Sequence, residues 1–67
     1  MLKMLQIIRY LKAQGLSLDQ IMSELTEIVD NGRSDYFELS DADVIRITDV
    51  FHNDELFDSA MKVGLNL

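Results

Sequence analysis

The stretch GLSLDQIMSEL, residues 15–25, carries the clearest structural signal in the chain. Ser17 is a favourable N-cap residue, and Gln20 follows it at the spacing of a capping box, in which each side chain accepts a hydrogen bond from the other residue's backbone N–H. Leu16 before the cap and Ile21 after it have the spacing of a hydrophobic staple. The stretch therefore predicts a helix that begins directly after Ser17.

This helix is predicted to continue well beyond Leu25. Apolar residues recur at helical spacing on one side of it, at Leu18, Ile21, Met22, Leu25, Ile28 and Val29. The segment Asp30-Asn31-Gly32 then provides an end, because glycine readily adopts the left-handed conformation that terminates helices. We expect the helix to stop near this segment.

A second helix is predicted upstream, over residues 2–14, with Gly15 as the residue that ends it. Its apolar residues fill one broad arc of a helical wheel: Met4, Leu5, Ile7, Ile8 and Leu11. The arc is wider than one neighbouring helix covers, so the sequence predicts a homodimer. The predicted self-association surface lies near Met4, Ile8 and Leu11.

Downstream, residues 33–39 read as a loop, with a short extended piece expected near 36–39. Ser40 then repeats the N-cap pattern, and Asp41 and Asp43 suit the first turn of a helix. Residues 44–51 are rich in β-branched side chains and are compatible with a strand. A helix is favoured because the start signal is explicit and strand alternation would place an aspartate beside two isoleucines.

A last helix is predicted to begin after Asn53 and to end at Gly64. Its apolar stripe consists of Leu56, Phe57, Ala60 and Met61. Together these patterns predict an all-α fold, a compact bundle of three or four short helices, in a single domain over residues 1–67. Because the chain is short and has no cysteine, its core gains nothing from disulfides, which further favours oligomerisation.

Charge is distributed unevenly along the chain, which has a net charge of −6. Residues 1–15 contain three basic and no acidic side chains, whereas the remainder contains all 12 acidic and three basic ones. Such a surface repels nucleic acid and anionic membranes over most of its area. Charged residues interrupt every apolar run, so neither a secretory signal nor a membrane span is expected, and the expected location is cytoplasmic.

The stretch LKAQGLSLDQIMSEL, residues 11–25, resembles the helix-turn-helix of resolvase and transposase proteins and a helix of MerR-type regulators. The resemblance implies a DNA-binding helix-turn-helix, in which a recognition helix should follow soon after Leu25. The sequence continues the same helix instead. If residues 17–30 were the recognition helix, its outward side chains would include Asp19, Glu24 and Glu27, which repel phosphate. A degenerate helix-turn-helix regulator that binds DNA as a dimer remains the alternative function.

Neither catalysis nor a metal site is predicted. His52 is the only histidine, and no nucleophile or second base accompanies it in a recognisable pattern. The segment from Asp30 faintly resembles a calcium loop, but the EF-hand spacing places Gly32, Asp35 and Asp41 at its third, sixth and twelfth positions, where other residues are needed. We therefore expect no enzyme activity and no cofactor.

The function predicted from these observations is that of a small acidic interaction module, of the kind common among bacterial and phage regulators. It would regulate or inhibit a partner protein, one with a basic surface of the kind that binds nucleic acid. The predicted partner-binding face has ten residues: Asp35, Tyr36, Phe37, Glu38, Asp41, Asp43, Asp49, Asp54, Glu55 and Asp58. A solvated face that only keeps the domain soluble is the competing interpretation.

Overall fold

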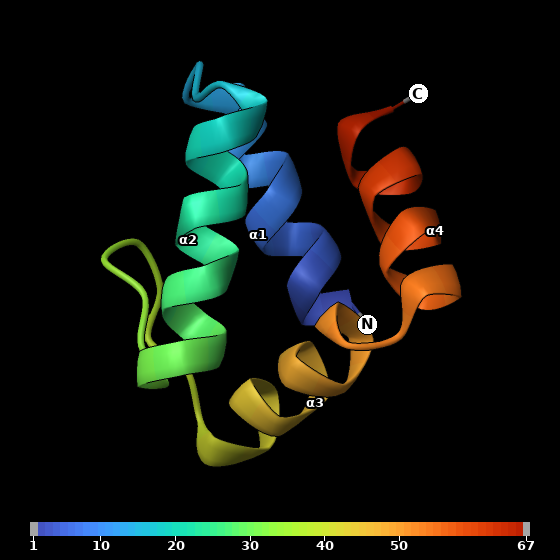
Figure 1. The fold of residues 1–67 in the computed structure, drawn as a ribbon. Helices are drawn as coiled ribbons and strands as arrows, with labels where there is room; N and C mark the ends of the chain where they lie inside the picture. Colours follow the sequence, from blue (N-terminus) through green and yellow to red (C-terminus); the bar gives the residue numbers. More distant parts are fainter. Residues whose placement is uncertain (1, 67) are drawn as a thin grey trace.

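Four helices make up most of the computed structural model, which describes residues 2–66 (Figure 1). In chain order they are α1 (Leu2–Ala13), α2 (Leu18–Asn31), α3 (Asp41–Phe51) and α4 (Asp54–Leu65). The all-α prediction is confirmed. Residues 44–51 are helical. Residues 36–39, where a short extended piece is expected, lie in a loop, and the described chain contains no strand.

The ends of α2 lie where the local signals placed them. Ser17 and Gln20 form the predicted capping box: the Ser17 N–H donates to Gln20 Oε1 at 2.8 Å and the Gln20 N–H donates to Ser17 Oγ at 3.2 Å. At the other end, Gly32 has φ 67° and its N–H donates to the carbonyl of Ile28. A left-handed residue at this position satisfies a carbonyl that the helix leaves unpaired.

A second capping box explains why α3 is a helix despite its β-branched residues. The Ser40 N–H donates to Asp43 Oδ2 at 3.3 Å, and the Asp43 N–H donates to Ser40 Oγ at 3.1 Å. Asp43 therefore closes the box as well as placing charge in the first turn. Asn53 caps α4 as predicted, with its Oδ1 accepting from the Leu56 N–H at 3.1 Å.

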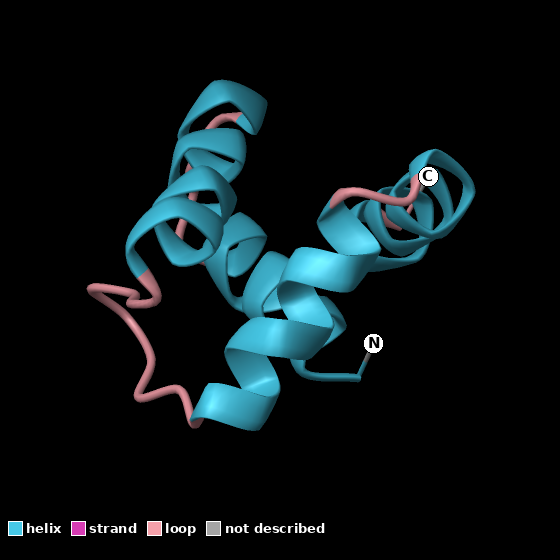
Figure 2. Ribbon diagram, turned by 60° about the horizontal axis from the view of Figure 1, so that its bottom comes forward, coloured by secondary structure: helices cyan, strands magenta, loops and turns pink. Residues whose placement is uncertain are grey.

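Helix α1 is the centre of the arrangement. It packs against α2, α3 and α4, most extensively against α4, whereas α2 and α4 do not approach each other closely. Figures 1 and 2 show α2 and α4 on either side of α1, with α3 crossing at one end. The buried core draws on all four helices and consists of Met4, Ile7, Ile8, Leu11, Ile21, Leu25, Ile28, Ile47, Val50 and Ala60.

This packing corrects the predicted self-association surface. Met4, Ile8 and Leu11 have exposed fractions of 0%, so they belong to the core of the folded chain and cannot also contact a second copy. The prediction counted one neighbouring helix for α1, but α1 has three. Its wide apolar arc is thus explained within one chain, and the predicted contact surface is wrong.

Gly64 also has a different role from the one predicted. It lies inside α4 and is buried, while the helix ends at Leu65 with Asn66 as a left-handed C-cap of φ 63°. A Cβ atom at Gly64 would lie 2.6 Å from Cγ2 of Ile8, so the missing side chain permits the close approach of α4 to α1. The Lys12 ammonium donates to the carbonyl of Leu65 and thereby links α1 to the end of α4.

Candidate partner-binding surface

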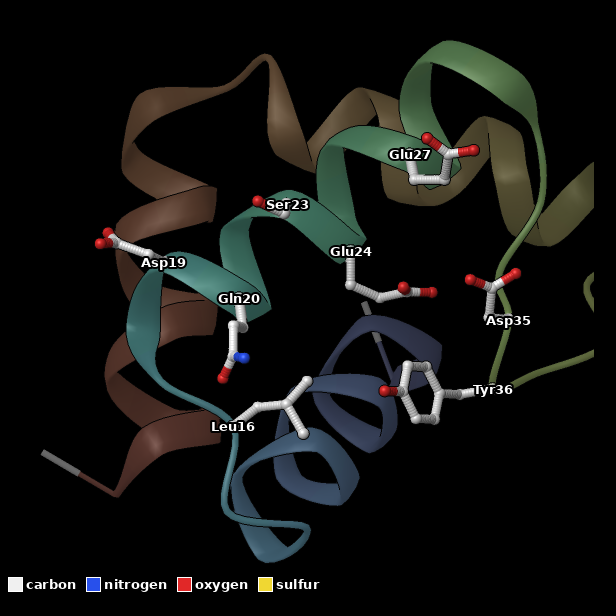
Figure 3. Close-up of a pocket in the computed structure, with 8 residues that line it drawn as sticks. All are labelled: Leu16, Asp19, Gln20, Ser23, Glu24, Glu27, Asp35 and Tyr36. Carbon is white, nitrogen blue, oxygen red and sulfur yellow. The ribbon is translucent and has the colours of Figure 1, made fainter.

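A concave surface lies between α2 and the loop that follows it (Figure 3). We call it the acidic concavity. It is lined by Leu16, Asp19, Gln20, Ser23, Glu24, Glu27, Asp35 and Tyr36. Four of these eight side chains are carboxylates, three from α2 and one from the loop, so it is lined mainly by acidic and polar groups.

Helical spacing places the α2 residues on this side of the domain. Gln20, Ser23, Glu24 and Glu27 follow one another at intervals of three, one and three residues, so they share a face of the helix. The neighbouring side of the helix carries buried apolar residues such as Ile21 and Ile28. The loop over residues 33–40 borders the polar face and adds its own side chains to it.

Ser34 attaches this loop to α2. Its hydroxyl donates to the Glu24 carboxylate and accepts the backbone N–H groups of Tyr36 at 3.0 Å and Phe37 at 3.3 Å. The Glu24 side chain is buried, with an exposed fraction of 9%. A buried carboxylate is tolerated only when hydrogen-bonded, so the serine satisfies Glu24 while fixing the turn. Glu24 therefore positions the loop, and Asp19, Glu27 and Asp35 are more accessible.

Aromatic packing holds the loop against α1. The Tyr10 ring lies 5.1 Å from the Phe37 ring, centroid to centroid, in an edge-to-face arrangement at 77°, and 6.1 Å from the Tyr36 ring. Phe37 is half-buried against the core, whereas Tyr36 has an exposed fraction of 45%. In Figure 3 the Glu24 side chain extends toward Asp35, the Tyr36 ring extends toward Leu16, and Asp19 points outward. Tyr36 is thus presented at the edge of the acidic concavity.

Arg33, which pairs with Glu27 of the concavity, is only loosely held. Arg33 Nε lies 3.4 Å from Glu27 Oε1, and the two side chains are 72% and 36% exposed. An exposed pair of this kind contributes little free energy and can exchange for another cation. Within residues 2–66, no three carboxylate or histidine side chains are arranged to hold a metal ion. His52 is exposed, occupies the C-cap of α3 and packs edge-on against Phe51.

The predicted partner-binding face is distributed over several parts of the structure. Asp35 and Tyr36 line the acidic concavity, and Phe37 packs against the core. Asp41 and Asp43 lie at the start of α3, about 16 Å along its axis from its other end, where α4 begins. The acids at the start of α4 are Asp54, Glu55 and Asp58. Glu38 is exposed on the loop, and Asp49 is exposed on α3.

The acidic residues of α2 were not included in that face. Asp19, Glu24 and Glu27 enter the sequence-based prediction only as residues that would repel the phosphates of DNA. Their spacing in the sequence shows that they share a face of the helix, but it does not show that the loop over residues 33–40 packs beside that face. The residue that holds the loop there is Ser34, which forms a hydrogen bond to Glu24, ten positions earlier in the sequence.

The segment that resembles a helix-turn-helix, residues 11–25, consists of the end of α1, a turn at residues 14–17 and the first half of α2. As expected from the sequence, α2 continues through Thr26 and Glu27 to Asn31 without a second turn. Comparisons of the chain with family models, curated proteins and solved structures gave no match. None of the described helices has the length and hydropathy that a membrane span requires.

Proposed function

We propose that this protein is a small acidic module that binds a basic surface of another protein and thereby regulates or blocks it. The observation that carries the proposal is the acidic concavity, in which Asp19 and Asp35 are exposed and Glu27 is half-buried beside Tyr36. Carboxylates accept hydrogen bonds from arginine in pairs, and tyrosine offers an aromatic face to a cation. A lysine or arginine of the partner would enter the concavity and displace Arg33 from Glu27.

The remaining acids support this proposal at longer range. The net charge is −6, and acidic side chains outside the concavity are exposed on the loop, on α3 and at the start of α4. A surface of one sign accelerates the encounter with a surface of the opposite sign. The association rate should therefore fall as salt is added, because ions screen charges beyond a Debye length of about 8 Å at physiological ionic strength.

A dimeric helix-turn-helix regulator is the alternative, and the placement of charge argues against it. If α2 were the recognition helix, its polar face would bring Asp19 and Glu27 to the phosphates. The basic residues Arg9 and Lys12 line a separate depression beside the end of α4. A gel-shift at low salt tests the alternative directly, since binding of duplex DNA would favour it.

The test of the proposed function uses a partner captured from the host and then purified. Stopped-flow association is measured at two ionic strengths for wild type and for Glu27→Lys/Asp35→Lys. The matched control is Glu38→Lys/Asp49→Lys, which changes the net charge equally at exposed positions outside the concavity. We expect at least about a tenfold slower association for the first variant and less than about threefold for the control.

Two results would contradict the proposal. If both double variants slow association equally, only net charge matters and the acidic concavity has no special role. If salt does not change the wild-type rate, the recognition is not electrostatic. Circular dichroism of both variants checks that the fold is retained.

A further inference from the structure

An apolar groove lies on another side of α2, between this helix and α4. It is lined by Leu18, Met22, Asp54, Phe57, Asp58, Met61, Lys62 and Leu65. The groove exists because α2 and α4 both pack on α1 but do not approach each other (Figures 1 and 2). Leu18 is 56% exposed, and the other apolar side chains of the groove are half-buried. These side chains therefore retain apolar surface that the core does not use.

Two parallel rows of side chains run along the α4 side of the groove. Phe57, Met61 and Leu65 form an apolar row at intervals of four residues, and Asp54, Asp58 and Lys62 form a charged row beside it at the same intervals. Residues four apart lie above one another on a helix. The rows follow nearly all of α4, about 17 Å, which equals about three helical turns.

We propose that this groove binds an amphipathic helix of a partner protein whose edge carries basic side chains. The inference rests on the proposed function, because it names the kind of partner segment that an acidic interaction module would bind. An apolar stripe repeating every three to four residues would lie on the apolar row, in the manner of other helices bound in grooves. Met22 and Met61 suit this role, since methionine side chains adapt to the shape of a ligand.

The charged row selects the chemistry of that helix. Asp54 and Asp58 lie one turn apart at one end of the groove, and Lys62 lies at the other and pairs with Asp58 at 3.0 Å. Both Asp58 and Lys62 are about two-thirds exposed, so this pair is weak and open to exchange. Two basic side chains one turn apart on the bound helix would face Asp54 and Asp58.

A second copy of this chain fits the groove less well. Two copies with a net charge of −6 each repel one another, and both would bring aspartates to the contact. The groove follows about three turns of α4, and a contact along three turns of one helix buries less than the roughly 800 Å² that each partner contributes to a standard interface. The basic helix of a second copy, α1, has its apolar face buried in its own core.

The test uses two synthetic peptides of about four turns each, with the same leucine pattern but with lysine or glutamate at all other positions. Methionine methyl groups of the protein are labelled with carbon-13 for NMR titration. The Met22 and Met61 methyl groups should shift with the leucine–lysine peptide, while Met4, which is fully buried in the core, should not. The leucine–glutamate peptide should leave all three unchanged.

Two matched variants locate the binding site. Leu18→Lys places a cation in the groove at an exposed position, and Ile45→Lys makes the same kind of change at an exposed residue of α3 that does not line the groove. We expect Leu18→Lys to weaken peptide binding at least about tenfold and Ile45→Lys less than about threefold. Equal losses in the two variants would overturn the proposal, as would equal binding of the two peptides or absence of the Met22 and Met61 shifts.

The remaining outcomes separate this inference from the proposed function. If Met22 and Met61 shift with protein concentration alone and sedimentation shows a dimer, a second copy occupies the groove and the proposal fails. If the leucine–lysine peptide does not bind but Glu27→Lys/Asp35→Lys still slows association with the captured partner, the acidic module stands and only the groove assignment falls.

Discussion

Gly64→Ala should destabilise the protein even though alanine is the better helix former. In an exposed helix the exchange would stabilise by about 1 kcal/mol. Here the new Cβ would lie 2.6 Å from Cγ2 and 2.9 Å from Cβ of Ile8, while favourable carbon–carbon contacts begin at about 3.5 Å. Because the Ile8 Cβ is fixed to the backbone of α1, the two helices must move apart by up to about 1 Å.

Overpacking of this kind costs about 1–3 kcal/mol. We expect a cost near the upper end of this range, because the new Cβ would meet both the Cβ and the Cγ2 methyl group of Ile8. After the gain in helix propensity, we expect a net loss of about 2 kcal/mol, or roughly 8–16 °C in Tm for a domain of this size. Urea and thermal unfolding measure the loss. Ser59→Ala, at an exposed position of the same helix, is the control and should stabilise slightly.

A double-mutant cycle with Ile8→Ala tests the cause. Ile8→Ala alone should cost about 2–5 kcal/mol, since Ile8 is fully buried. Within that background the 2.6 Å contact with Cγ2 is gone and only the 2.9 Å contact with the Cβ atom remains, so Gly64→Ala should cost clearly less than it does in wild type. The reasoning is refuted if Gly64→Ala is as stable as Ser59→Ala, or if its effect is the same with and without the Ile8 side chain.

Three further variants test other parts of the structure. Leu25→Ala should lower the free energy of unfolding by about 2–5 kcal/mol because Leu25 is fully buried. A urea melt that matches wild type would show that α2 does not pack in the core through Leu25. Ser34→Ala should lower the free energy of unfolding by about 1–3 kcal/mol, because it leaves Glu24 without its hydrogen-bond donor. It should also speed hydrogen exchange at the Tyr36 amide, which donates to the Ser34 hydroxyl, and unchanged exchange would contradict the anchoring role of Ser34. Ser40→Ala should cost about 1 kcal/mol through loss of the α3 cap, and unaltered stability would show that the capping box contributes nothing.

The helices were predictable because their start signals are local. Ser17, Ser40 and Asn53 act on backbone N–H groups within three residues, so a short window of sequence contains both partners of each bond. The same locality decided α3, where the capping pattern outweighed a run of β-branched residues whose strand preference depends on neighbouring strands. The described chain has no strand with which that run could pair.

Features that depend on tertiary packing were not predictable in the same way. Gly64 resembles any helix-ending glycine until the position of Ile8 is known. The apolar arc of α1 resembles a dimer surface until three neighbours are placed around it. The acidic concavity combines one helical face of α2 with a loop that is held by the hydrogen bond from Ser34 to Glu24 and by the packing of Phe37 on Tyr10. In each case the deciding contact joins separate elements, and helical periodicity carries no information about it.

The pairing of α1 with α4 has a consequence for the time at which the chain can fold. Helix α1 leaves the ribosome first, yet the helix against which it packs most extensively ends at Leu65. At about 5–20 residues per second, translation of the roughly fifty intervening residues takes on the order of 3–10 seconds. During that interval the apolar face of α1 lacks the helix that covers most of it. A nascent chain stalled before Asp54 should therefore bind chaperones and be sensitive to proteolysis. A longer nascent chain from which α4 has emerged should resist proteolysis.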